Sequence, residues 1–174
     1  MLLVNADNGN PLAPMEMGLL TADGILSTNP DAADEPHIDQ VLTGMNRSEE
    51  WHISKKLVHI IDREVDSVYH YRLWDEEGFH YLIRADDRIV NLNGEEVKFS
   101  EIVSRCLEDG DFRVTGRVKY KKIHAICSVC ERTVVLDRPA HVRLDGRRQE
   151  VSGKPIELRL VMTNLADEKT GRTL

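Results

Sequence analysis

The apolar positions between residues 57 and 83 predict a strand, a helix and a second strand. Residues 57–61 form a short, β-branched, nearly continuous apolar run, which is typical of a strand buried on both faces. The run stops at Asp62. The residues that then share one helical face are Val65, Val68, Tyr69 and Leu73. Glu64 and Asp66 would lie in the first turn of that helix, where acids suit the helix dipole, and residues 79–83 predict the next strand.

Turn-forming residues divide the segment before this unit. Asn8-Gly9 lies between the apolar stretches 2–4 and 15–20 and predicts a β-hairpin. The acidic, proline-bounded segment 29–36 predicts a loop. Apolar residues at helical spacing between 38 and 45 predict a short amphipathic helix. A further helix is expected over 97–107.

Beyond Gly110 the period of the pattern changes to two, which predicts mostly antiparallel strands. In residues 112–121 apolar positions alternate with a polar face that carries Arg113, Arg117, Lys119 and Lys121. Alternate residues of a strand stand about 6.6–7 Å apart, close to the spacing of successive phosphates in an extended nucleic-acid strand. The stripe therefore suits DNA, although a solvated outer face of a sheet has the same composition. Arg147 and Arg148, after a predicted Asp145-Gly146 turn, would add backbone contacts.

The charge distribution supports a polyanionic partner for the second part of the chain. The 174 residues carry a net charge of −7, but residues 111–174 contain 14 Lys+Arg and 8 Asp+Glu, whereas residues 1–110 contain 9 and 22. No apolar run approaches the ~20 residues of a membrane span, and no signal peptide is recognisable. Three cysteines favour free thiols in a reducing compartment, so we expect a cytoplasmic protein with no membrane contact.

Asp62 is the main candidate for chemistry. A carboxylate at the carboxyl end of a strand in an α/β sheet lies at the edge where such folds bind ligands. There it can bridge two hard cations that activate an oxygen nucleophile and stabilise the leaving oxygen of a phosphodiester. The alternative is that Asp62 only caps the following helix.

The sequence around Asp62 resembles a known signature. Ile60-Ile61-Asp62-Arg63-Glu64-Val65-Asp66 is similar to the Asp-Arg-Glu-x-Asp motif that follows the second catalytic aspartate in DDE transposases of bacterial insertion sequences, the branch with an interrupted ribonuclease-H-like core. The hairpin around Asn8-Gly9, with residues 11–14 and then 18–20, resembles that family's second and third core strands. Residues 79–84 resemble the strand ending in arginine that follows the catalytic helix, and the basic β region resembles the family's insertion domain.

The resemblance implies an α/β fold: a partial ribonuclease-H-like core, a mixed sheet with helices, over residues 1–86, then a β-rich insertion domain over 87–174. It implies metal-dependent hydrolysis and strand transfer at transposon ends, with Mg²⁺ or Mn²⁺ as cofactor, DNA as partner and a homodimer as a candidate assembly of the full-length enzyme. The first and third catalytic carboxylates of the family have no counterpart in this sequence. We therefore expect an internal fragment that is inactive alone.

Each supporting residue also has a structural interpretation. Glu64 and Asp66 are interpreted as dipole and capping residues because helical geometry turns them away from the edge of the sheet. Arg63 can contact a backbone phosphate or pair with an acidic neighbour. By resemblance Arg84 faces DNA, and its alternative is a surface salt bridge.

Two other functional classes stay open. One is a noncatalytic β-rich DNA-binding or interaction module, in which Asp62 only caps a helix. The other is a small zinc-binding protein that uses residues among His124, Cys127, Cys130 and His141. A strand would place Cys127 and Cys130 on opposite faces, which favours the interpretation of these cysteines as small buried hydrophobic residues.

Overall fold

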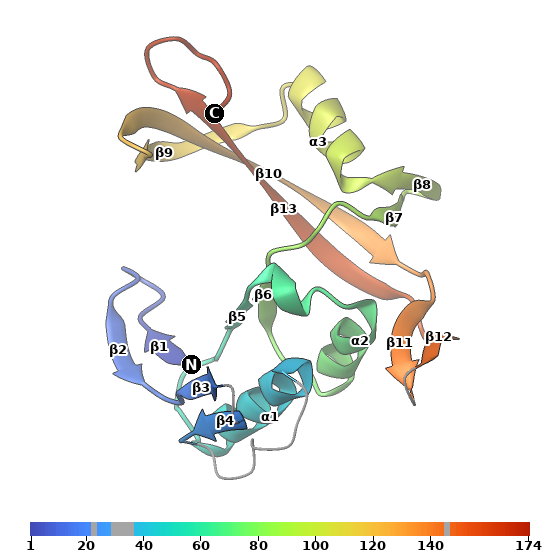
Figure 1. Ribbon diagram of the computed structural model, residues 1–174. Helices are drawn as coiled ribbons and strands as arrows, with labels where there is room; N and C mark the ends of the chain where they lie inside the picture. The colour runs from blue at the N-terminus through green and yellow to red at the C-terminus, as the bar shows by residue number, and fades with distance from the viewer. Residues whose placement is uncertain (22–23, 29–36, 145–146) are drawn as a thin grey trace. The chain divides into compact units, whose positions relative to one another are not determined.

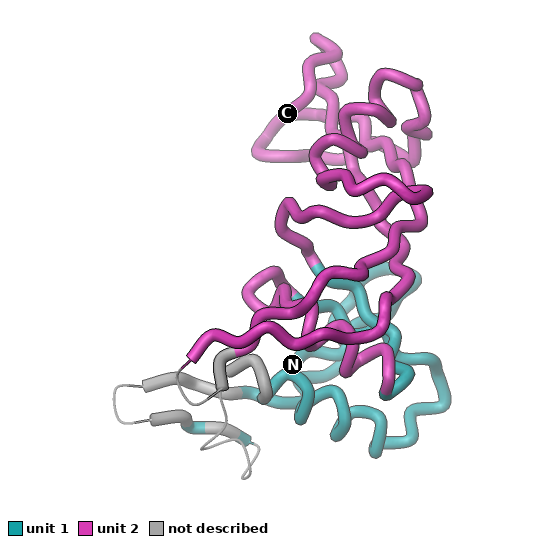
Figure 2. The backbone as a smooth tube through the Cα atoms, turned by 90° about the vertical axis from the view of Figure 1, so that its right-hand side faces the viewer, with its two compact units in different colours: residues 1–61, 77–83 teal, residues 62–76, 84–174 magenta. Residues whose placement is uncertain are grey.

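The computed structural model describes residues 1–21, 24–28, 37–144 and 147–174. These residues form three α-helices and thirteen strands in five sheets, so the protein is mixed α/β and mostly strands, as expected (Figure 1). The chain divides into two compact units, residues 1–61 with 77–83 and residues 62–76 with 84–174 (Figure 2). The domain boundary at residue 86 stays a prediction.

The first unit begins with the hairpin predicted at Asn8-Gly9. β1 (Leu2–Val4) pairs antiparallel with β2 (Pro11–Pro14). Gly9 takes a φ of 72° and donates its N–H to the Asn5 carbonyl at 2.8 Å, which closes the connection. The second strand is thus the proline-flanked segment rather than residues 15–20. Within that stretch, β3 (Gly18–Thr21) pairs with β4 (Gly24–Ser27).

The predicted helix near residue 40 is α1 (His37–Glu50), and the predicted loop 29–36 lies outside the described residues. β5 (His59–Ile61) and β6 (Tyr81–Ile83) then form a two-stranded parallel sheet. Ile60 pairs with Leu82, and these side chains are 71% and 52% exposed. The expectation that residues 57–61 are buried on both faces is therefore wrong, because nothing in the described structure covers the face that carries Ile60.

The helix after β5 begins later than its apolar pattern predicted. Residues directly after Asp62 form a 3₁₀ turn, η2 (Arg63–Val65), and α2 (Val68–Glu76) follows. Asp66 ends η2 with a ψ of 83°, which is not helical, and the first turn of α2 contains no acid. The expectation that Glu64 and Asp66 occupy the first turn of this helix is wrong. Only Glu64 lies in a first turn, that of η2.

The second unit is built on antiparallel ladders, as the period-two pattern predicted. Its remaining elements are β7 (Ile89–Leu92), β8 (Glu95–Lys98), α3 (Phe99–Glu108), β9 (Arg113–Tyr120), β10 (Ile123–Leu136), β11 (Ala140–Leu144), β12 (Arg147–Val151) and β13 (Ile156–Asp167). The main sheet has the order β13-β10-β7-β8, with β9 also paired to β10. The turn between β7 and β8 is Asn93-Gly94, with φ values of 54° and 91°. The predicted Asp145-Gly146 turn lies outside the described residues.

The core of the second unit lies on one face of the β10–β13 ladder. Cys130 pairs with Met162 and Leu136 with Ile156, and all four side chains are buried. Between these pairs, residues of opposite parity such as Glu131 point to the exposed face, as a pleated strand requires. The buried residues contributed by β7, β8 and α3 are Val90, Val97, Ile102 and Cys106.

A buried arginine anchors α2 within the second unit. The Arg72 side chain donates from Nε to the Lys154 carbonyl at 2.9 Å and from Nη2 to the Arg138 carbonyl at 2.8 Å. Arg72 is 8% exposed, and a Cβ on Gly153 would lie 2.6 Å from its Cδ atom. The guanidinium thus satisfies carbonyls of the segments before β11 and before β13. Because a glycine is present at position 153, the backbone can approach this side chain closely.

We expect Arg72→Ala to lower the free energy of unfolding by about 2–4 kcal/mol, because two carbonyls would lose a charged donor and a packed stem would leave a cavity. Urea unfolding followed by the fluorescence of the buried Trp74, in a Trp51→Phe background, measures this loss. Arg148→Ala, at an exposed position of β12, is the matched control and should change the midpoint little. Equal effects of the two substitutions would contradict the anchoring role.

Candidate functional site

Asp62 occupies the position that the sequence predicted, directly after a parallel strand. The β5–β6 pairing ends with Ile61 opposite Ile83, so Asp62 and Arg84 are the next residues of the two strands. Asp62 is exposed and has extended backbone angles. Its Oδ1 atom accepts the Arg63 N–H at 2.8 Å, so the side chain caps η2. The carboxylate therefore caps a turn and is also open to solvent, and its metal-binding role stays a prediction.

Asp66 is the buried member of the motif. Its side chain is 2% exposed and forms an ion pair with Arg88. It also accepts hydrogen bonds from the Tyr71 hydroxyl and, at 2.6 Å, from the Asp86 N–H. Arg88 lies over the Tyr71 ring, 5.3 Å from its centroid. Asp66 therefore ties the segment after β6 to α2, and its oxygens are committed to protein donors.

The remaining charged residues of this region stay on the surface. Nη1 of Arg63 lies 3.4 Å from Oδ1 of Asp86, and both side chains are more than half exposed. Such a pair contributes little to stability and can exchange for another anion. Glu64 and Arg84 are exposed, and within the described ranges Arg84 forms no ion pair. Phosphate contacts by Arg63 and Arg84 stay predictions.

Asp62 has no set of neighbouring ligands in the described part of the chain. Cys106, Asp111 and Cys130 are the one group there whose three ligating atoms all lie within 4.8 Å of one another. A two-metal centre requires several carboxylate oxygens that converge on each ion. The residues around Asp62 do not complete such a centre.

The basic stripe of β9 is interrupted by a β-bulge. Gly116 pairs with Cys127, but Val114 pairs with Ser128, so Thr115 is an extra residue whose hydroxyl donates to the Cys127 carbonyl at 3.2 Å. Arg117 and Lys119 therefore pair with Ile126 and His124, whereas Arg113 pairs with Val129. Ile126 and His124 lie an even number of residues apart on β10 and share a face, whereas Val129 lies an odd number of residues from both. Side chains alternate along a strand, so Arg113 lies on the opposite face of the sheet. The prediction of one face with four cations is wrong, because the bulge shifts the alternation.

Lys121 lies beyond β9, in the turn that leads to β10. Tyr120 pairs with Ile123, and the two intervening residues, Lys121 and Lys122, have φ values of 44° and 71°. Left-handed backbone in residues other than glycine costs about 1 kcal/mol each. Nζ of Lys121 lies 5.2 Å from the centroid of the Tyr120 ring. The cations near this turn therefore include Arg117, Lys119, Lys121 and Lys122, of which Arg117 pairs with Glu168 at 2.7 Å.

The second predicted basic group lies elsewhere in the unit. Arg147 and Arg148 are exposed on β12, and Arg148 pairs in register with Arg143. β9 and the β11–β12 ribbon lie at opposite ends of β10 (Figure 1). For a strand of 14 residues this separation is roughly 45 Å. The sequence-predicted cations are thus two groups rather than one continuous surface.

The cysteines are arranged differently from the zinc pattern considered for the sequence. Cys127 and Cys130 lie on opposite faces of β10, as predicted, because Cys130 pairs with Met162 and Cys127 with Leu165. Cys130 instead adjoins Cys106 of α3, and burial together with the Cys130 thiol raises the pKa of Cys106. No sequence spacing links Cys106 to Cys130. Only the packing of a helix on a strand brings them together.

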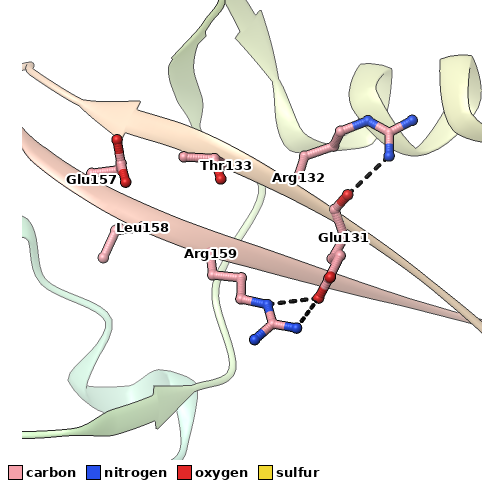
Figure 3. A pocket seen from close by; sticks show the side chains of 6 residues that line it. All are labelled: Glu131, Arg132, Thr133, Glu157, Leu158 and Arg159. Atoms are coloured by element: carbon pink, nitrogen blue, oxygen red, sulfur yellow. Dashed lines mark hydrogen bonds and ion pairs between the residues drawn. The ribbon is translucent and has the colours of Figure 1, made fainter.

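A shallow pocket of about 350 Å³ lies along β10 and β13 (Figure 3). Its lining residues are Glu131, Arg132, Thr133, Glu157, Leu158 and Arg159. Nε of Arg159 donates to the Glu131 carboxylate at 2.6 Å, so these two charges of the pocket neutralise each other. None of the sequence-predicted site residues lines it.

No protein-family model, curated protein or solved structure matches this chain. Within the described residues, no helix combines the length and apolarity that crossing a membrane requires.

The two aspartates of the motif should respond differently to the same substitution. Asp66→Asn leaves Arg88 without its buried partner and should lower the free energy of unfolding by about 3 kcal/mol. Asp62→Asn should change it by less than about 0.5 kcal/mol, because asparagine caps a helical turn nearly as well as aspartate. Urea denaturation of both variants measures the difference. A larger loss for Asp62→Asn would contradict these assignments.

Proposed function

We propose that this chain is part of a DDE transposase, in which Asp62 is the second catalytic aspartate. In this proposal the complete enzyme performs metal-dependent phosphodiester hydrolysis and strand transfer at transposon ends. The partial ribonuclease-H-like core carries Asp62, and the β-rich segment after it is an insertion domain that contacts DNA. The observation that carries the proposal is the exposed Asp62 carboxylate, directly after a parallel strand, in a motif whose other aspartate is buried.

The chain path around Asp62 supports this assignment. β5 and β6 are parallel and are connected through η2 and α2, so the chain order is strand, helix, strand. In open α/β sheets, ligands bind beyond the carboxyl ends of the strands, where Asp62 and Arg84 follow β5 and β6. An acid thus follows one strand, and the neighbouring strand is followed by a cation that forms no ion pair within the described residues. The acid suits a divalent ion, and the cation suits a phosphate.

The exposed face of the β5–β6 pair supports a partial core. Parallel sheets are normally covered on both faces and contain more than two strands. Ile60 and Leu82 instead present a paired apolar surface to solvent. Additional elements of a ribonuclease-H-like core would cover these side chains.

The cations of the second unit support contact with DNA. Arg117, Lys119, Lys121 and Lys122 cluster at one hairpin, and Lys119 lies on the same face as Arg117. Lys121 and Lys122 adopt left-handed backbone angles, which asparagine and glycine would adopt with less strain. These two lysines add positive charge at the tip of the hairpin.

We expect this chain to bind Mn²⁺ weakly at Asp62 and not to cleave DNA. Mn²⁺ titration in the presence of duplex DNA should broaden the amide NMR signals of residues 62–64 and 84–86 before others. Asp62→Asn should remove the effect, whereas Asp137→Asn, at another exposed acid, should not. Broadening that is unchanged in Asp62→Asn would contradict the metal role.

The same samples test whether the site is incomplete. Supercoiled DNA incubated with the chain and Mg²⁺ or Mn²⁺ should stay intact, because Asp62 lacks converging carboxylates. Cleavage that disappears in Asp62→Asn would show a complete centre and overturn that part of the proposal.

We expect the bulge in β9 to determine which cations bind DNA. The triple variant Arg117→Ala, Lys119→Ala, Lys121→Ala should reduce the slope of log affinity against log salt by about 0.9 for each lost phosphate contact. Arg113→Ala, on the same strand but on the opposite face, is the matched control and should leave the slope unchanged. Fluorescence anisotropy with a labelled duplex at several salt concentrations measures both. A slope that depends on Arg113 and not on the triple variant would contradict this surface.

A further inference from the structure

The end of α3 brings an acidic residue beside a buried thiol. Gly110 follows the helix with a φ of 72°, and the Asp111 N–H donates to the Cys106 carbonyl at 3.0 Å. The Gly110 N–H donates to the Leu107 carbonyl at 3.3 Å, so α3 ends in the six-to-one and five-to-two pattern of a Schellman motif. This cap fixes Asp111 one turn beyond Cys106, at the same end of the helix.

β10 supplies a second thiol to this point. Cys130 lies on the core face of β10, where α3 packs, and it is 4% exposed while Cys106 is 2% exposed. The two sulfur atoms and a carboxylate oxygen of Asp111 all lie within 4.8 Å of one another. In a tetrahedral zinc site with Zn–S of about 2.3 Å and Zn–O of about 2.0 Å, ligand atoms stand somewhat closer than this limit, so small rotamer changes suffice.

Arg132 holds two of these groups in place. It lies on the same face of β10 as Cys130, two residues further along the strand. Its Nη1 atom donates to the Cys130 sulfur at 3.1 Å, and its Nη2 atom pairs with Oδ2 of Asp111. Second-layer donors of this kind orient ligands and stabilise thiolates in metal sites. Oδ1 of Asp111 stays available to an ion.

We propose that Cys106, Asp111 and Cys130 form a binding site for a thiophilic divalent cation, with zinc as the expected ion. Two thiolates and a carboxylate carry three negative charges, which Zn²⁺ and the Arg132 guanidinium balance. Mg²⁺ and Ca²⁺ prefer oxygen ligands and would not select this set. Three protein ligands leave a fourth position, which water can reach because the Asp111 side chain is 39% exposed. The bound ion would join the end of α3 to β10.

The site is independent of the proposed transposase function. None of its residues belongs to the motif around Asp62 or to the cations near the β9–β10 turn. It also differs from the Cys127–Cys130 pair that the sequence suggested, since it uses Cys106 in place of Cys127. A structural zinc at this position would stabilise the second unit whether or not that unit contacts DNA.

Native mass spectrometry of the reduced full chain with Zn²⁺ tests the proposal. We expect one zinc per chain, with the loss of two thiol protons. Co²⁺ should give the absorption bands of a tetrahedral thiolate site. Cys106→Ser and Cys130→Ser should each abolish both signals, and Arg132→Leu should weaken Zn²⁺ binding about 10–100-fold.

Cys127→Ser is the matched control, because Cys127 lies on the opposite face of the same strand. It should keep the full zinc stoichiometry. Thermal melting of the unmodified chain with and without Zn²⁺ adds a test that needs no substitution, and the melting temperature should rise with Zn²⁺. The absence of zinc and cobalt binding, or binding that survives in both Cys106→Ser and Cys130→Ser, would overturn the proposal. So would a Cys106–Cys130 disulfide that forms in air equally fast with and without Zn²⁺.

Discussion

The continuous pairing of β10 is the constraint on which the second unit depends. Twelve consecutive residues of β10 pair with β13, from Ala125 opposite Asp167 to Leu136 opposite Ile156. Because side chains alternate along a strand, this register assigns every residue of both strands to the core or to solvent. A slip of β10 by one residue against β13 would turn Glu131 toward the core and expose Cys130 and Val134. The hydrophobic core, the contact with α3 and the exposed pocket therefore all depend on the register of β10 against β13.

The bulge in β9 shows how one residue can redistribute charge on such a ladder. Thr115 adds a residue to β9 without adding one to β10. The alternation of side chains between the two faces of the sheet is therefore reversed on one side of Thr115 relative to the other. Arg117 and Lys119 are grouped with the lysines of the turn, while Arg113 is separated from them. The basic surface is consequently compact and lies at one end of β10. A small, dense group of cations suits local contact with a phosphate backbone more than a long track.

The two aspartates of the Asp62 motif differ in burial and therefore in role. The Asp66 carboxylate is taken out of water and is compensated by Arg88, Tyr71 and the Asp86 N–H. Removing a partner from such a pair is costly, so Asp66 determines how the segment after β6 is held. Within the described residues, the Asp62 carboxylate accepts one hydrogen bond, from the Arg63 N–H, and keeps capacity for other ligands. An exposed carboxylate with few hydrogen bonds to the protein is suited to bind an ion or a substrate.

The local pattern of the sequence determined much of the secondary structure and the chemistry of individual residues. The antiparallel strands after Gly110, the strand that ends before Asp62 and the opposite faces of Cys127 and Cys130 follow from period and turn residues, which act over a few positions. Asn93-Gly94 carried the same kind of signal for the β7–β8 hairpin, although the strands there were not predicted. The apolar pattern did not predict the late start of α2, nor the pairing of Asp66, just before this helix, with Arg88, which is 22 residues away.

Contacts between distant segments were decided by tertiary structure alone. The meeting of Cys106, Asp111 and Cys130 requires α3 to pack on the core face of β10, and the anchoring of Arg72 requires carbonyls 66 and 82 residues away. The position of the β9 bulge depends on the register against β10, to which Gly116 in the sequence gives only a weak clue. Local periodicity sets which side of an element is apolar. Which elements meet, and hence which side chains form a site, depends on the packing of the whole chain.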